Sequence, residues 1–217
     1  MEPTMGRARG VKKTEEIEAL SVHAFGGLSI YYNGSPITVI WESQKARLLF
    51  CYLLVTYDQW MHRDKLIEAL WPGCDPGAGA NNFKTTISRL RKSFSGARIV
   101  NPVLMQGEAV RINVASISLD SSRFVQKATV GIKSLARGEM NEARRCLEEA
   151  QDLYTGEFLT EEPFNPFITS ARNELSELHI SVIKSLEKIY QQEGNIDALE
   201  AIRMLTRALI TRTADSI

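Results

Sequence analysis

Apolar residues recur at helical spacing between residues 80 and 94. Phe83, Ile87, Leu90 and Phe94 follow one another at steps of four, three and four, which is the apolar stripe of an α-helix. At about 100° per residue, the opposite face carries amides, hydroxyls and cations but no carboxylate. The residues of that face are Asn81, Thr85, Ser88, Arg89 and Lys92, with Lys84 and Arg91 on its flank.

This polar face has two interpretations. Amide, hydroxyl and cationic side chains read base edges and bind phosphates in the major groove of DNA. The same pattern is also typical of a basic amphipathic helix that faces only solvent. The segments before and after the helix decide between them.

Short strands are predicted ahead of the first long helix. Residues 22–25, 28–32 and 37–40 have strand-like patterns, and Asn33-Gly34 is a strong hairpin turn. A small antiparallel sheet is therefore expected, followed by a helix that Ser43 caps. The apolar positions that keep helical spacing in this helix are Ala46, Leu49, Phe50, Leu53, Leu54 and Tyr57.

A second, short helix is predicted over residues 62–71, where Pro72 and Gly73 end it. A loop over residues 72–79 then leads into the basic helix, so the order is that of a helix-turn-helix. Residues 98–100 and 110–113 are strand-like and flank Gln106-Gly107. They predict a β-hairpin in the position of the wing of a winged-helix protein.

From residue 115 onward the pattern predicts helices only, over residues 121–136, 140–154, 166–192 and 196–210. Helix pairs joined by glycine-containing turns indicate a repeat fold like that of tetratricopeptide (TPR) proteins. The strict 34-residue consensus is missing, and a plain helical bundle is the alternative. The expected organisation is a flexible lead-in (residues 1–20), a winged-helix domain (21–114) and a helical domain (115–217).

The distribution of charge supports two unlike halves. The whole chain has a formal net charge of zero, which gives no global argument for nucleic acid. Residues 79–107, however, contain five cations and no acids, whereas residues 139–200 contain fourteen acids and five cations. One half suits a polyanion that the other half would repel.

The remaining composition argues against several kinds of site. Cys51, Cys74 and Cys146 are widely spaced, so neither a disulfide framework nor a metal site is expected. No phosphate-binding loop of NTPases and no catalytic motif is recognisable, so no cofactor and no enzymatic activity are expected. No apolar run approaches the length needed to cross a bilayer, and a cytoplasmic protein without a membrane partner is predicted.

Two sets of motifs resemble a known family. Residues 41–49, 63–72 and 87–92 resemble the first, second and recognition helices of an OmpR-type winged helix. Residues 153–159, 171–175 and 193–195 resemble the bacterial transcriptional activation domain that follows this winged helix in SARP-type regulators. The resemblance implies an α+β OmpR-type winged helix-turn-helix with an N-terminal antiparallel sheet, followed by an all-α TPR-like domain.

The resemblance also implies a function, that of a sequence-specific transcriptional regulator in the bacterial cytoplasm, at the nucleoid. Double-stranded promoter DNA and RNA polymerase are the implied partners, and the helical half would contact a second copy or an upstream sensor or ATPase. Activation, rather than repression, is the implied outcome.

Specific residues are expected to make these contacts. For base contacts they are Thr85, Ser88 and Arg89. For phosphate contacts they are Asn81, Lys84, Arg91, Lys92, His62 and Arg63, although a helix-capping role is equally open for the last two. For the wing they are Gly107 and Arg111, and for the loop that faces RNA polymerase they are Pro72, Gly73, Asp75 and Pro76.

Two other interpretations remain open from the residues. In the first, the chain is a helical-repeat adaptor whose winged helix docks protein instead of DNA. Glu108 at the expected wing tip supports it, because a carboxylate there would repel phosphate. In the second, distant residues meet in the fold to form an enzyme site that no motif reveals.

Overall fold

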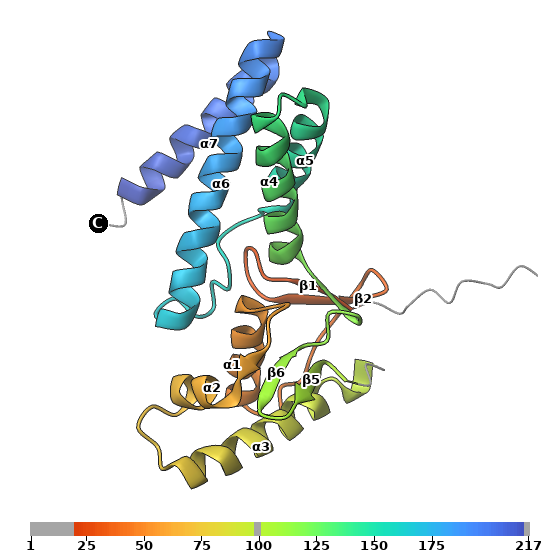
Figure 1. Cartoon of the computed structure of the whole chain (residues 1–217), viewed down its shortest axis with the longest axis vertical. Coiled ribbons are helices and arrows are strands. Elements are labelled where there is room, and N and C mark those ends of the chain that lie inside the picture. Colours follow the sequence, from red (N-terminus) through yellow and green to blue (C-terminus); the bar gives the residue numbers. More distant parts are fainter. Residues whose placement is uncertain (1–19, 98–100, 215–217) are drawn as a thin grey trace, which may run out of the picture.

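The computed structural model describes residues 20–97 and 101–214. In this part of the chain, two small sheets and three helices are followed by four further helices. Figure 1 shows the third helix, α3, at one end of the molecule and the helices α4 to α7 gathered toward the other end. The predicted order of strands, three helices, hairpin and helices is therefore present.

The first sheet contains a strand that the sequence did not predict. Its strands are β1 (Leu20–His23), β2 (Ser29–Tyr32), β3 (Ser35–Ile37) and β7 (Ile117–Leu119), in the order β3-β2-β1-β7. Asn33 and Gly34 both have positive φ, as the predicted hairpin turn requires. Two predictions were wrong: the returning strand is residues 35–37 instead of 37–40, and the sheet is mixed because β7 pairs with β1 in parallel.

Three helices follow the hairpin. They are α1 (Gln44–Val55), α2 (Arg63–Leu70) and α3 (Pro76–Ser93), and a short 3₁₀ turn, η1 (Ser95–Ala97), follows α3. The Ser43 hydroxyl caps α1 by accepting a hydrogen bond from the Ala46 N–H at 3.1 Å. The predicted apolar positions within α1, from Ala46 to Leu54, are buried. Tyr57 lies beyond the end of α1.

The second sheet consists of β4 (Met61–His62), β5 (Val103–Gln106) and β6 (Ala109–Ile112), in the order β4-β6-β5. The predicted hairpin around Gln106-Gly107 is confirmed, with Gly107 at φ +57°. The strand before its turn is residues 103–106, and residues 98–100, which were predicted for that position, lie outside the described residues. Strand β4 was not predicted, because a strand of two residues is too short to show an alternation of apolar and polar positions.

The helices of the C-terminal half are α4 (Asp120–Ala136), α5 (Met140–Leu153), α6 (Pro166–Glu193) and α7 (Ile196–Ala214). They agree with the predicted ranges to within a few residues, and consecutive helices pack on each other. Gly138 and Gly194 have positive φ in the turns after α4 and α6, where only glycine adopts this backbone readily. The expectation of helices alone after residue 115 was wrong, because β7 precedes α4.

The two halves share one continuous hydrophobic core. The buried Asp120 carboxylate, at the start of α4, accepts hydrogen bonds from the backbone N–H groups of Ala24 (2.9 Å) and Phe25 (3.1 Å). On α6, the Arg172 guanidinium donates to the carbonyl oxygens of Phe158 and Leu159, both at 2.8 Å. The N-terminal part of α6 reaches α1, as Figure 1 shows.

Candidate nucleic-acid interface

The orientation of α3 is set by its buried side. Phe83, Ile87 and Leu90 are buried, as their spacing predicted. Just after the helix, the Phe94 ring is buried 5.1 Å from the Phe50 ring and 5.6 Å from the Trp41 ring, measured between centroids. Because this contact attaches both α1 and the segment before it to the end of α3, the opposite face of α3 points away from the core.

The helix α3 begins four residues earlier than predicted. The Asp75 carboxylate accepts hydrogen bonds from the Gly77 and Ala78 N–H groups at 3.0 and 3.1 Å, and Pro76 occupies the first turn, where no N–H is needed. The predicted loop over residues 72–79 is therefore wrong, and the connection between α2 and α3 spans residues 71–75. The Asp75 cap and Pro76 stabilise the start of the helix by more than the low helix propensity of Gly77 and Gly79 destabilises it.

Three of the four residues predicted to face RNA polymerase lie in this tight connection, and the fourth, Pro76, is the first residue of α3. Pro72, Gly73, Asp75 and Pro76 are all exposed, and Gly73 has φ +71°. Beneath them, the Lys45 ammonium donates to the Leu70 carbonyl oxygen at 2.5 Å and lies 5.8 Å from the Trp71 ring centroid. The connection is thus anchored to α1 while its outer side stays open.

The outward face of α3 presents most of the predicted contact residues together. Exposed residues of this face are Asn81, Lys84, Thr85, Ser88 and Arg89. Within residues 20–97 and 101–214, none of their side chains takes part in a hydrogen bond or an ion pair. Asn82 is also exposed and was missed, although its spacing of seven residues from Arg89 would have placed it on the same side.

Two of the predicted phosphate contacts have partners within the protein. Arg91 is half-buried, and its guanidinium donates to the Asn101 side-chain oxygen at 3.2 Å and to the Val103 carbonyl oxygen at 3.5 Å. Lys92 is exposed, but its ammonium lies 3.0 Å from a Glu42 carboxylate oxygen. Arg91 therefore connects α3 to β5, and Glu42 offsets the charge of Lys92, a contact across fifty residues that the sequence did not reveal.

His62 and Arg63 lie against the hairpin. Strand β4 pairs His62 with Ala109 of β6. The His62 ring caps α2 by accepting a hydrogen bond from the Asp64 N–H at 3.3 Å, so the capping role that was open for both residues is confirmed for His62. The Arg63 N–H donates to the Glu108 carbonyl oxygen at 2.8 Å, and the Arg63 guanidinium pairs with the Glu108 carboxylate.

The predicted wing residues lie near this network. Gly107 is exposed at the hairpin turn. The Arg111 guanidinium lies 4.6 Å from the centroid of the Trp60 ring, within the range of a cation–π contact. The Trp60 side chain is 39% exposed, and its contact with Arg111 was not predicted.

The described residues contain no group of His, Cys, Asp or Glu side chains arranged to hold a metal ion. In the same ranges, no helix has the length and apolar content needed to span a bilayer. What the outward face of α3 offers is a row of amides, hydroxyls and unpaired cations. This arrangement can donate hydrogen bonds to an anionic, hydrogen-bonding surface.

Comparison with known proteins places the helical half in a described family. The model of the bacterial transcriptional activator domain matches residues 119–213. The regulatory protein AfsR of Streptomyces coelicolor is 29% identical over 195 residues, which cover 89% of this chain and 19% of AfsR. The transcriptional regulatory protein MoaR1 of Mycobacterium tuberculosis is 25% identical over 153 residues, covering 69% of this chain and 49% of MoaR1. The chain thus spans about half or less of the length of these relatives.

A solved structure has the same fold. Mycobacterium tuberculosis EmbR, determined in complex with a low-affinity phosphopeptide, superposes with a TM-score of 0.61 at 23% sequence identity. The superposition covers 90% of this chain and 56% of the EmbR chain. The match therefore includes both halves and the junction between them.

Proposed function

Because this chain belongs to the SARP-type family of transcriptional regulators, we propose that it binds double-stranded promoter DNA through the outward face of α3. The observation that carries the proposal is the composition of that face. Within the residues that the structure describes, the cations Lys84 and Arg89 have no ion-pair partner and lie beside amides and hydroxyls, and Glu42 pairs with Lys92 near the end of the helix. Figure 1 also places α3 at the end of the molecule away from the acid-rich helices, where a duplex meets the least repulsion.

In this proposal the N-terminal half acts as an OmpR-type winged helix. The helix α3 enters the major groove, with Thr85, Ser88 and Arg89 toward the base edges and Asn81 and Lys84 toward phosphates. Arg89 suits a bidentate contact with guanine. Arg91 contributes by fixing the hairpin to α3, and the helical half supplies contacts with a second copy or with a signalling partner. No enzymatic step is needed for this function.

The test is binding to a pool of bacterial promoter fragments across a salt series, with wild type and Arg89→Ala in parallel. We expect enriched sites, a steep loss of affinity with salt, and a loss of about 1–3 kcal/mol for the preferred site in the variant. Arg123→Ala is the matched control, because Arg123 is an exposed cation of α4, remote from α3. Equal losses of affinity for the preferred site in the two variants would contradict a base contact by Arg89.

The exposed connection between α2 and α3 is proposed to face RNA polymerase. Pro72→Ala should leave promoter affinity unchanged, because Pro72 lies outside α3 and outside the core. It should lower transcript yield in a reconstituted reaction with RNA polymerase by about fivefold, the effect of losing roughly 1 kcal/mol at an interface. Unchanged yield at saturating protein would remove this connection from the polymerase contact.

A protein-docking adaptor is the second candidate, and one observation favours it. Two cations near the proposed DNA surface are already paired with acids, Lys92 with Glu42 and Arg63 with Glu108. If no promoter fragment is retained even at low salt, the outward face of α3 is better explained as a protein contact. Pull-downs with the helical half would then identify the partner.

A further inference from the structure

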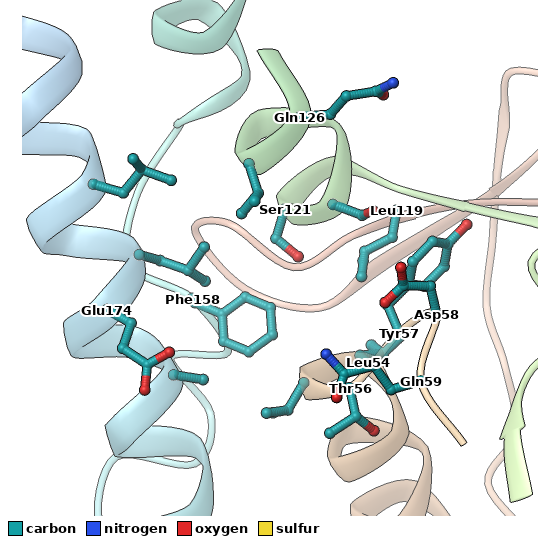
Figure 2. A pocket seen from close by; sticks show the side chains of 16 residues that line it. Leu54, Thr56, Tyr57, Asp58, Gln59, Leu119, Ser121, Gln126, Phe158 and Glu174 are labelled. Carbon is teal, nitrogen blue, oxygen red and sulfur yellow. The ribbon is translucent and has the colours of Figure 1, made fainter. Parts of the chain in front are cut away.

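The junction of the two halves contains a pocket that DNA binding does not use. It has a volume of about 580 Å³, within the range of small-molecule sites. Its walls come from the end of α1 and the following turn, from the start of α4 and from α6, as Figure 2 shows. The pocket therefore exists only because the halves meet.

The interior of the pocket is largely apolar. In Figure 2 the Phe158 ring lies between α6 and the end of α1, and Phe158, Leu119 and Leu54 form the buried base of the pocket, each about 1% exposed. Leu175 and Leu178 of α6 also line the pocket. Val125 of α4 is 40% exposed at this site, so apolar surface is open to solvent. An apolar ligand body would remove this surface from water, which favours binding.

The charged residues that line the pocket are both acids. Asp58, in the turn after α1, and Glu174, on α6, are exposed and lie on opposite sides of the Phe158 ring (Figure 2). Neither carboxylate forms an ion pair within the described residues, and the Glu174 carboxylate accepts one hydrogen bond, from the Ser170 hydroxyl at 3.3 Å. The other polar lining groups are hydroxyls and amides from residues such as Ser122 and Gln126, so no lining cation offsets the negative potential.

We propose that this pocket binds a small organic cation with an apolar body, such as an alkyl or aryl amine. The apolar part would lie against Val125, Leu175 and Leu178, and an ammonium group would approach Glu174, Asp58 or both. Acidic lining disfavours carboxylate ligands of the same size, because like charges repel in a partly desolvated site. A ligand here contacts α1, α4 and α6 at once, so it stabilises the arrangement of the halves.

The test uses octylamine, octane-1,8-diamine, 1-octanol and octanoate as probes, with calorimetry and thermal unfolding of the whole chain. We expect saturable binding of both amines with a raised Tm, at least tenfold weaker binding of octanol, and none of octanoate. Octanol or octanoate binding as tightly as the amines would overturn the assignment of a cation site. Absence of saturable amine binding at millimolar concentration would overturn the site itself.

Four variants locate the binding. Glu174→Gln should weaken amine binding about threefold to fivefold, as expected for one partly exposed charge pair, and the double variant Asp58→Asn/Glu174→Gln about tenfold. Glu177→Gln, an exposed acid of the same helix that does not line the pocket, should leave binding unchanged. Val125→Trp should block the pocket with no loss of fold, because Val125 lies at the surface. Unaltered amine binding in Val125→Trp, with the far-UV spectrum of wild type, would place the amines elsewhere and refute the proposal.

Discussion

At the tip of the β5–β6 hairpin, the Glu108 carboxylate pairs with the Arg63 guanidinium and lies 3.4 Å from His62 Nε2. Arg63 and His62 are two of the groups predicted to bind phosphate. The carboxylate therefore competes with a phosphate for the same donors, and it would also repel a DNA backbone that approaches the wing. One acid at this position weakens two potential contacts at once.

Glu108→Gln should consequently raise promoter affinity about threefold to tenfold at low salt. The substitution removes one negative charge at the wing and frees Arg63 for a phosphate, so the slope of log affinity against log salt should steepen by about 0.9. Fluorescence anisotropy across a salt series measures both quantities. Glu177→Gln, an equal charge change on α6, should shift neither, and a Glu108→Gln affinity at or below that of wild type would contradict the competition.

At the scale of elements, the contact between α4 and α5 depends on a glycine. A Cβ added at Gly131 would lie 2.6 Å from Leu147 Cγ and 3.2 Å from the Ala143 carbonyl oxygen. Leu147 and Ala143 are completely buried, so neither side has room to move. The close approach of these two helices therefore requires a residue without a side chain at position 131.

Gly131→Ala should lower the free energy of unfolding by about 1–2 kcal/mol. Overpacking of a tight core costs about 1–3 kcal/mol, and the gain in helix propensity from glycine to alanine returns up to about 1 kcal/mol. Urea denaturation measures the difference. Gly96→Ala is the control, since an added methyl group there meets nothing within 4 Å, and a Gly131→Ala protein as stable as this control would refute the packing argument.

At the scale of the whole molecule, an aromatic cluster joins the halves. Phe25, beyond β1, packs on Phe124 of α4 at 5.4 Å and on Tyr154 at 4.6 Å. The His179 ring of α6 stacks on Tyr154 at 3.8 Å, and its Nε2 lies 3.0 Å from the Gln151 side-chain oxygen. Burial lowers the pKa of His179 from its ordinary value to about 4, so the folded protein keeps this ring neutral.

The free energy of unfolding should therefore fall as the pH decreases from about 6.5 to about 4. The unfolded chain protonates His179 below about pH 6.5, whereas the folded chain does so only near pH 4. The contribution of His179 is complete above pH 6.5 and is lost progressively down to pH 4. Between pH 7.5 and pH 5 this loss amounts to about 2 kcal/mol.

His179→Phe keeps a ring beside Tyr154 and removes the titration, so comparison with this variant isolates the effect. Urea denaturation at both pH values should show wild type losing about 2 kcal/mol more than the variant. The opposing contribution of Asp120, whose pKa burial raises, is present in both proteins and cancels. Identical pH dependence in the two would show that His179 is accessible to protons in the folded state.

Much of the fold could be predicted because its signals are local. The spacing of Phe83, Ile87 and Leu90 determines which side of α3 is buried, and the Ser43 cap and the Asn33-Gly34 turn depend only on neighbouring residues. The polar composition of the outward face of α3 follows from the same periodicity. Its role in DNA binding remains a prediction.

The tertiary structure decided the features that join distant segments. The sequence did not reveal that β7 pairs with β1, that Asp120 binds the backbone near Ala24, or that Glu42 and Glu108 pair with Lys92 and Arg63. A three-residue strand has too few positions to show alternation, and an ion pair between residues fifty apart leaves no periodic trace. The sequence by itself thus determined the helices and the exposed side of α3, whereas only the folded chain decided which of its cations are free and how the two halves enclose a pocket.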